Sequence, residues 1–137
     1  MPKLPVPPAI DAFLRAPNPC VSAQLRPDGS PHTAATWYDW EGGRVLLNLD
    51  AGRKRLAYLR RDPRVSLTVL GADSWYRHVS LLGRVVSIED DPDMVDIDRL
   101  AARYTGRPYR NRERPRVSVW IQAESWHAWD GGRPWRG

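Results

Sequence analysis

The chain has 137 residues and one cysteine, and its net charge is +5 at pH 7. A chain of this length loses roughly two-thirds of its unfolded surface on folding, which is enough for a core of its own. A single cysteine excludes an intrachain disulfide, and no apolar run approaches the ~20 residues of a membrane span. We therefore expect a soluble, cytoplasmic protein with one domain over residues 1–137, in which residues 1–17 form an N-terminal arm and a short helix.

Alternating hydrophobic and polar residues, separated by glycine and proline turns, predict mostly β-strands. In chain order we expect a helix over 7–14, strands over 20–26, 31–40 and 45–49, a helix that begins near residue 53 and ends before residue 63, strands over 65–70 and 78–88, a helix over 94–104, a loop over 106–116 and a strand over 117–129. About six strands with two or three short helices predict a mainly β fold, a closed or nearly closed barrel whose openings the helices cover.

Three local signals refine this outline. The turns at Asp28-Gly29 and Gly42-Gly43 favour antiparallel hairpins, because glycine adopts positive φ without strain. Gly83 interrupts the longest expected strand and indicates a bulge or a barrel corner. The aspartates at 90, 91 and 93 come just before a helix, where the helix dipole favours negative charge.

The helix near residue 53 begins in the opposite way. Arg53, Lys54 and Arg55 occupy its first turn, where free N–H groups and the helix dipole disfavour each positive charge by roughly 0.3–1 kcal/mol. Such a triplet is explained if a phosphate or another fixed anion binds there, held by helix N–H groups and guanidinium groups together. The alternative is a solvated basic turn on a basic protein.

The basic charge is almost wholly arginine, since Lys3 and Lys54 are the only lysines. A basic surface favours acidic partners, which include nucleic acids, anionic coenzymes and phosphorylated substrates. No recognition helix, zinc motif or RNA-binding aromatic motif is present, so we expect no nucleic-acid partner. His32, His78 and His127 lack metal-ligand spacing, which predicts no metal site. Cys20 is expected to serve ordinary packing.

Seven short segments, in one order over residues 10–129, carry a family resemblance. They are Asp-Gly-Ser-Pro at 28–31, Thr-Trp-Tyr at 36–38, Leu-Leu-Asn-Leu at 46–49, Gly-Arg-Lys-Arg at 52–55, Asp-Pro-Arg-Val at 62–65, Arg-His-Val at 77–79 and Arg-Val at 116–117. Through them the chain resembles the pyridoxamine 5'-phosphate oxidase-like FMN-binding split barrel superfamily, and within it the small deazaflavin (coenzyme F420)-dependent reductases. The resemblance implies a split β-barrel of about six antiparallel strands, with a coenzyme cleft at a homodimer interface.

The resemblance also implies residue roles. Arg53 and Arg55 would grip the coenzyme phosphate with Lys54 beside them; the family commonly has lysine where Arg55 stands, so the charge is kept. The positions that would line the ring system, largely through backbone groups, are Pro31, His32, Thr33, Ala34 and Asn48. His78 stands where FMN-binding relatives often carry glutamine, and it would reach the coenzyme of the other subunit.

The function that this resemblance implies is an oxidoreductase, a reductase that passes a hydride between reduced coenzyme F420 and a small electron-poor organic substrate. The alternatives are an FMN-dependent oxidase or reductase on the same fold, and a non-catalytic carrier of a flavin or a haem-like ligand. The absent glutamine and the short C-terminal tail favour the deazaflavin branch.

No residue is an obvious dedicated acid, so the catalytic residues are unknown at this stage. Tyr58, Tyr76 and Tyr109 are candidate proton donors, with structural hydrogen bonding as the alternative. Trp37 and Trp75 are candidates to line a pocket for a planar ligand, although tryptophan more often fills a core or an interface. Further basic residues are candidate contacts for the anionic tail of a deazaflavin, namely Arg60, Arg61, Arg64 and the arginines of the loop over 107–116.

Overall fold

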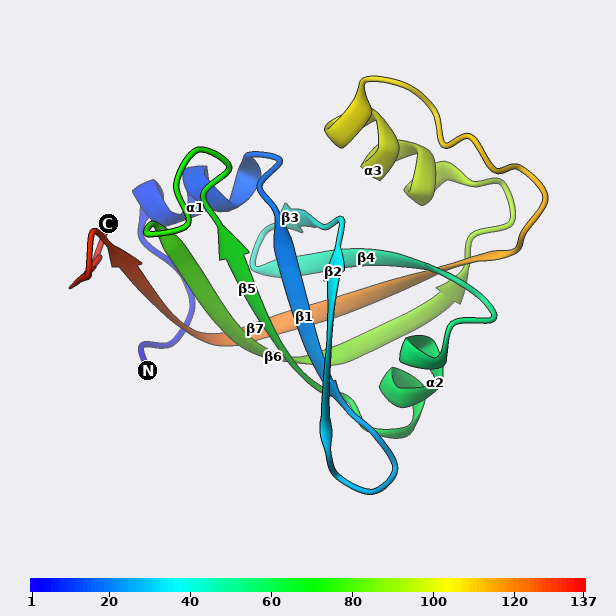
Figure 1. Cartoon of the computed structure of the whole chain (residues 1–137), viewed down its shortest axis with the longest axis horizontal. Coiled ribbons are helices and arrows are strands. Elements are labelled where there is room, and N and C mark those ends of the chain that lie inside the picture. The colour runs from blue at the N-terminus through cyan, green and yellow to red at the C-terminus, as the bar shows by residue number, and fades with distance from the viewer.

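The computed structural model describes residues 1–137. Eight strands form one antiparallel sheet in the order β2-β1-β5-β6-β7-β4-β3, and β8 pairs with β7. The strands are β1 (Cys20–Leu25), β2 (Pro31–Thr36), β3 (Asp39–Glu41), β4 (Arg44–Asp50), β5 (Arg64–Leu70), β6 (His78–Asp90), β7 (Arg116–Asp130) and β8 (Arg133–Pro134). The sheet curls but its edges β2 and β3 do not pair, so the barrel is split and the predicted mainly β fold class is confirmed (Figure 1).

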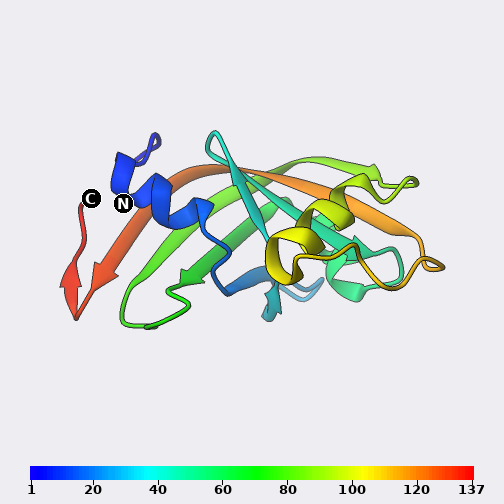
Figure 2. The same cartoon turned by 90° about the horizontal axis from the view of Figure 1, so that it is seen from above.

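Three helices cover the curled sheet. They are α1 (Pro8–Arg15), α2 (Lys54–Arg61) and α3 (Val95–Thr105). Helix α1 contacts β3, α2 contacts β1, and α3 contacts β4 and β7. Figure 2 shows α1 beside the C-terminal end of the chain and α3 at the opposite end of the sheet. No helix is long and apolar enough to cross a membrane.

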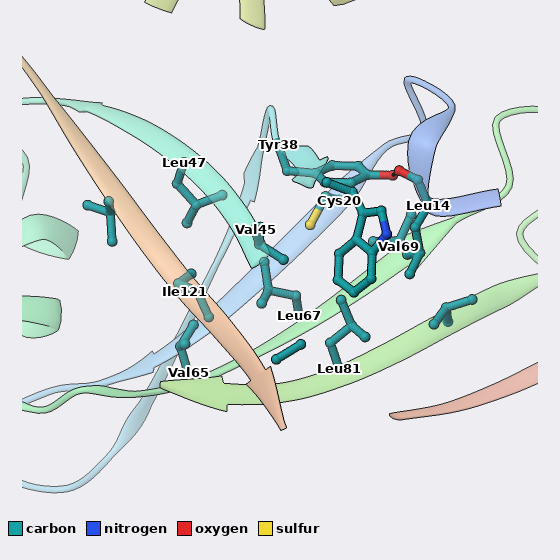
Figure 3. Packing of buried hydrophobic residues seen from close by; sticks show 14 of the residues in the cluster. Leu14, Cys20, Tyr38, Val45, Leu47, Val65, Leu67, Val69, Leu81 and Ile121 are labelled. Atoms are coloured by element: carbon teal, nitrogen blue, oxygen red, sulfur yellow. Dashed lines mark hydrogen bonds between the residues drawn. The ribbon is translucent and has the colours of Figure 1, made fainter. Parts of the chain in front are cut away.

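One cluster of 21 buried residues makes the core. It joins the inward-facing side chains of β1, β4, β5, β6 and β7 with the buried faces of α1 and α2, and Figure 3 shows Leu67, Leu81 and Ile121 packed within it. Tyr38 lies over one side, and its hydroxyl donates to the backbone oxygen of Leu14 at 2.7 Å. This bond ties α1 to the segment between β2 and β3.

The predicted strand over 31–40 is wrong in one respect, because the structure divides it. Strand β2 pairs with β1 and ends at Thr36, whereas β3 begins at Asp39 and pairs with β4 through the Gly42-Gly43 turn. The buried Tyr38 turns the chain inward between them. The sheet therefore has eight strands, two more than about six, since β3 and the two-residue β8 were not expected.

The irregular features of β6 and α3 follow the predicted signals. The register of β6 against β7 shifts between Leu82 and Gly83, which confirms the bulge. The Asp91 carboxylate accepts hydrogen bonds from the backbone N–H groups of Asp96 and Ile97, at 3.2 and 3.0 Å. Asp91 thus satisfies two free donors at the start of α3.

Candidate functional site

A basic cavity of about 670 Å³ lies where the start of α2 faces β2. It is lined by Arg26, His32, Ala34, Ala35, Gly52, Arg53, Lys54, Arg55 and Tyr58. Four of these nine residues are cationic and one is a histidine, and no carboxylate lines the cavity. Its chemistry suits an anion.

A second cavity, the aromatic cavity, has a volume of about 570 Å³. Its lining includes Trp37, Asn48, Tyr104, Tyr109 and Arg116, together with Pro17, Pro19, Cys20, Ala35, Thr36, Arg55, Ala72 and Ile97. Ala35 and Arg55 line both cavities, so the two meet there. Together they form a groove along β2 with a basic arm and an aromatic arm.

The basic arm is built by the turn that precedes α2. The Asp50 carboxylate accepts the N–H of Gly52 at 2.8 Å, which folds the chain back after β4. Arg53 is then the N-cap residue of α2, with no side-chain cap and no acidic residue in the first turn. The helix is oriented by the burial of Leu56 and Leu59. The free N–H groups of α2 and the cations Arg53, Lys54 and Arg55 therefore lie together at the start of the helix, as predicted.

Arg55 is the most constrained of these cations. It is half-buried, its Nη1 donates to Ser22 Oγ at 3.0 Å, and no carboxylate lies within ion-pair distance. Burial lowers the pKa of Arg55, and the neighbouring cations Arg53 and Arg116 lower it further. The fold thus holds an unneutralised charge at the junction of the two arms.

Arg116 is its counterpart in the aromatic arm. Its Nε donates to Asn48 Oδ1 at 2.9 Å and its Nη2 to the Asn48 backbone oxygen at 3.1 Å, while its guanidinium lies 4.8 Å from the centre of the Tyr109 ring. Burial is the largest cause that lowers the pKa of Arg116, and the positive charge of Arg53 adds to it. Arg116 also has no carboxylate within ion-pair distance.

Asn48 is held by a buried polar network below Arg116. Its Nδ2 donates to Asp91 Oδ2 and to Ser118 Oγ, each at 3.1 Å, and Ser118 Oγ donates to Asp96 Oδ2 at 2.6 Å. With both amide hydrogens engaged below, the Asn48 oxygen faces Arg116. The network therefore fixes the guanidinium in the groove.

The aromatic wall consists of three rings. Trp37 stacks on Tyr104 with centroids 5.6 Å apart and an interplanar angle of 7°, and the edge of Tyr109 meets Trp37 at 86°. Tyr104 is fixed because its hydroxyl donates to the backbone oxygen of Asn18 at 2.7 Å. A planar ligand finds a rigid apolar surface here.

The predicted site residues do not all meet. The basic arm brings together Arg53, Lys54, Arg55, His32 and Ala34, and Asn48 lies in the aromatic arm. Pro31 and Thr33 alternate with them along β2 and are exposed on its other side, so their side chains lie outside the groove.

His78 also lies outside the groove of its own chain, at the start of β6, where its ring is 3.3 Å from the Trp75 backbone oxygen. Trp75 lines neither arm; its side chain is 63% exposed and stacks on Tyr76. Of the two tryptophan candidates, Trp37 alone lies in the groove. Of the tyrosine candidates, Tyr109 lies in the aromatic arm and Tyr58 in the basic arm.

Carboxylates of the chain already neutralise three of the candidate tail contacts. The pairs are Arg64 with Asp62, Arg112 with Asp98 and Arg114 with Asp50. No ion pair engages Arg60, Arg61, Arg107 or Arg110. No group of three or more His, Cys, Asp or Glu side chains is placed to hold a metal ion.

Comparisons with known proteins agree on the family. The family model for pyridoxamine 5'-phosphate oxidase matches residues 6–130. An F420 reductase is 26% identical, with a TM-score of 0.81, over 88% of this chain and 98% of that one. The conserved hypothetical protein Rv2991 from Mycobacterium tuberculosis is 30% identical, with a TM-score of 0.71, over 93% and 86%. General Stress Protein 26 from Bacillus anthracis shares the fold at 20% identity, with a TM-score of 0.66, over 93% and 95%. No curated protein matches the sequence.

Proposed function

The chain belongs to the pyridoxamine 5'-phosphate oxidase family, and on this premise we propose that it is an oxidoreductase that uses the deazaflavin coenzyme F420. The observation that carries the proposal is the pair of half-buried, unneutralised guanidinium groups, Arg55 and Arg116, in one groove with an aromatic wall. Burying unpaired charges is costly, so the arrangement suits a ligand that brings negative charge and a planar ring. The likeness to an F420 reductase supports this choice.

In this proposal the basic arm binds the phosphate of the coenzyme and the aromatic arm binds its ring system. In the proposed complex, Arg53, Lys54 and Arg55 hold the phosphate at the start of α2, where the helix N–H groups add their own donors. The ring system lies in the aromatic arm against Trp37, with Arg116 beside it. When bound, a reduced deazaflavin supplies a hydride to an electron-poor C=C, C=N or C=O group.

In such a reaction the protein would orient the coenzyme and the substrate, exclude water and donate a proton. The rings of Trp37, Tyr104 and Tyr109 shield the aromatic arm from water. Tyr109 is the proposed proton donor, since its hydroxyl accepts from Arg116 Nη1 at 3.3 Å and keeps its own hydrogen free to donate. A further cavity of about 500 Å³ is also lined by Trp37 and Tyr109 and has room for a small organic substrate.

An FMN-dependent oxidoreductase is the second candidate, favoured by the family model itself. FMN also has a phosphate and a planar ring, so it fits the same two arms. It lacks the polyglutamate tail of F420, and it leaves the unpaired cations Arg60, Arg61, Arg107 and Arg110 without a ligand partner.

Absorption titration tests the proposal directly. The purified protein is titrated with each coenzyme, and we expect F420 to bind more tightly than FMN. When the coenzyme is supplied as reduced F420, we expect it to be reoxidised on addition of an electron-poor acceptor. Tighter FMN binding, with FMN present in the protein as purified, would assign the second candidate. Tight F420 binding without turnover of any acceptor would instead indicate a non-catalytic carrier.

A further inference from the structure

Four polar side chains form a continuous hydrogen-bonded relay beneath the basic arm. Arg55 Nη1 donates to Ser22 Oγ at 3.0 Å, Ser22 Oγ donates to Gln24 Oε1 at 3.1 Å, and Gln24 Nε2 lies 2.6 Å from His32 Nδ1. The two middle residues, Ser22 and Gln24, are 0% and 1% exposed. The relay thus runs from α2 through the interior side of β1 to β2, and only its two ends line the basic cavity.

The direction of every bond in the relay is fixed. Gln24 Nε2 lies 2.9 Å from the backbone oxygen of His32, which only accepts hydrogen bonds, so the amide nitrogen must be the atom on this side. The second amide hydrogen then faces His32 Nδ1, and Nδ1 must be the acceptor. At the other end, a guanidinium only donates, so Ser22 accepts from Arg55 and gives its hydrogen to Gln24 Oε1.

A neutral histidine whose Nδ1 accepts carries its hydrogen on Nε2. His32 Nε2 has no hydrogen-bond partner in the chain, and the ring lines the basic cavity beside Arg53 and Arg55. The ring is further oriented by the Tyr58 ring, at a centroid distance of 5.6 Å and an angle of 70°. His32 Nε2 is therefore a hydrogen-bond donor, like the arginine and lysine groups that line the cavity with it.

We propose that Gln24 and Ser22 are positioning residues, in which Gln24 holds His32 as its Nε2–H tautomer and Ser22 holds Arg55, so that His32 and Arg55 donate together to a bound phosphate group. Without the relay the imidazole exchanges between two tautomers, and one of them turns a lone pair toward the anion. The identification of the phosphate as that of a coenzyme rests on the proposed function, whereas the tautomer does not. This role explains why polar residues, Ser22 and Gln24, occupy two of the most buried positions of β1.

The test uses the coenzyme-free protein and nitrogen NMR of its histidine rings. At pH 8.5, where an imidazole is ordinarily neutral, long-range proton–nitrogen correlations distinguish the two tautomers, and we expect His32 to be held as Nε2–H. Gln24→Leu, which removes the donor to Nδ1, is expected to produce a mixture of tautomers, whereas Ser22→Ala leaves that donor in place and should not change the tautomer. Gln24→Glu is expected to move the hydrogen to Nδ1, because a carboxylate only accepts.

Ser66→Ala is the matched control, since Ser66 lies on the neighbouring strand β5 and donates to the backbone oxygen of Leu81 at 3.2 Å. It should leave the tautomer unchanged. In a titration with inorganic phosphate, Ser22→Ala should weaken binding about tenfold, the effect of about one charge-assisted hydrogen bond, and Ser66→Ala should have no effect.

The outcomes separate this inference from the proposed function. A wild-type His32 with its hydrogen on Nδ1, an unchanged tautomer in both Gln24 variants, or unchanged phosphate binding in Ser22→Ala overturns the relay whatever coenzyme binds. A wild-type Nε2–H tautomer that responds to both Gln24 variants, in a protein that binds phosphate but not F420, supports the relay and overturns the coenzyme assignment.

Discussion

Arg55 and Arg116 line the same cavity from α2 and β7, and neither guanidinium has a carboxylate within ion-pair distance. Each instead donates to neutral groups, Arg55 to Ser22 and Arg116 to Asn48. Neutral acceptors orient a cation without cancelling its charge, so the fold keeps both charges available to a ligand. The two uncompensated charges therefore destabilise the free protein, and an anion bound in the proposed complex would offset this cost.

The basic triplet should contribute to coenzyme affinity and not to stability. We expect Arg53→Ala combined with Arg55→Ala to weaken coenzyme binding by roughly 2–5 kcal/mol, because charge-assisted bonds to a phosphate are lost. The free energy of unfolding should be unchanged or higher, since two like charges leave a helix N-terminus. Calorimetry and denaturant unfolding measure the two quantities.

The control for this change is Arg60→Ala combined with Arg61→Ala. It removes the same charge from the last turn of the same helix, where the dipole favours cations. Its effect on the affinity for FMN, which has the phosphate but not the anionic tail, should be much smaller than that of the Arg53 and Arg55 changes. Equal losses of FMN affinity in the two double variants would mean that Arg53, Lys54 and Arg55 form only a solvated basic turn.

Salt should distinguish the two coenzymes. The advantage of F420 over FMN is expected to be largest at low ionic strength, because contacts between exposed arginines and an anionic tail are screened over a Debye length of about 8 Å near physiological salt. Arg107→Gln with Arg110→Gln should reduce that advantage and leave FMN affinity unchanged. An F420 advantage that does not change with salt would contradict an electrostatic contact with the tail.

We also propose that the protein is a homodimer, as the resemblance implies. On β1 the residues Val21, Ala23 and Leu25 face outward, and Leu82 on the outer side of β6 is 45% exposed. Sedimentation at micromolar concentration should give a dimer, and Leu82→Arg should shift it toward the monomer. Val95→Arg, at a residue that is 66% exposed on α3, is the matched control. A wild-type monomer with normal coenzyme affinity would overturn the proposal.

Cys20 should be unreactive in the folded protein. Its side chain is 2% exposed, and burial raises the pKa of its thiol to about 12. Alkylation at pH 8 is expected to be slow until the protein is unfolded, because the thiolate is the reactive form. An unfolded cysteine thiol has its ordinary pKa of 9.0, so the free energy of unfolding should fall as the pH rises from about 9 to about 12. Cys20→Ala should remove that part of the pH dependence.

Gly83 should be the glycine whose replacement most disturbs the sheet. A Cβ at this bulge would meet the backbone oxygen of Gln122 on β7 well inside van der Waals distance. Gly83→Ala is therefore expected to lower the free energy of unfolding by about 1–3 kcal/mol. Gly52→Ala is the control, because its Cβ would lie 3.4 Å from the Asp50 carboxylate, an ordinary contact. Thermal unfolding of both variants compares the two sites.

Local signals allowed much of the fold to be predicted. The helix that starts at Arg53 and the bulge at Gly83 each depend on residues within a few positions of one another. Arg116 and Tyr104 could not be placed in the groove in this way, because their positions depend on the pairing of β4 with β7 and on the packing of α3 over that pair. Periodicity within one segment contains no information on such pairing.

The two middle residues of the relay, Ser22 and Gln24, were missed for a different reason. On β1 the buried positions include Ser22 and Gln24, while the apolar Val21 and Leu25 are less buried. Ordinary alternation would place the apolar residues inside. Polar residues at inward positions of a strand are themselves a signal, since they are stable there only when every hydrogen bond is satisfied.

Trp37 and Tyr38 are the two residues that separate β2 from β3, and these strands are the opposite edges of the sheet. The barrel is thus held together at its seam by a covalent link and side-chain packing, with no ladder of backbone hydrogen bonds across it. A change in the width of this seam breaks no strand pairing, whereas widening the barrel anywhere else does. Because Trp37 is also part of the aromatic wall, a shift of β2 relative to β3 would move one side of the groove while every strand pair of the sheet stays intact.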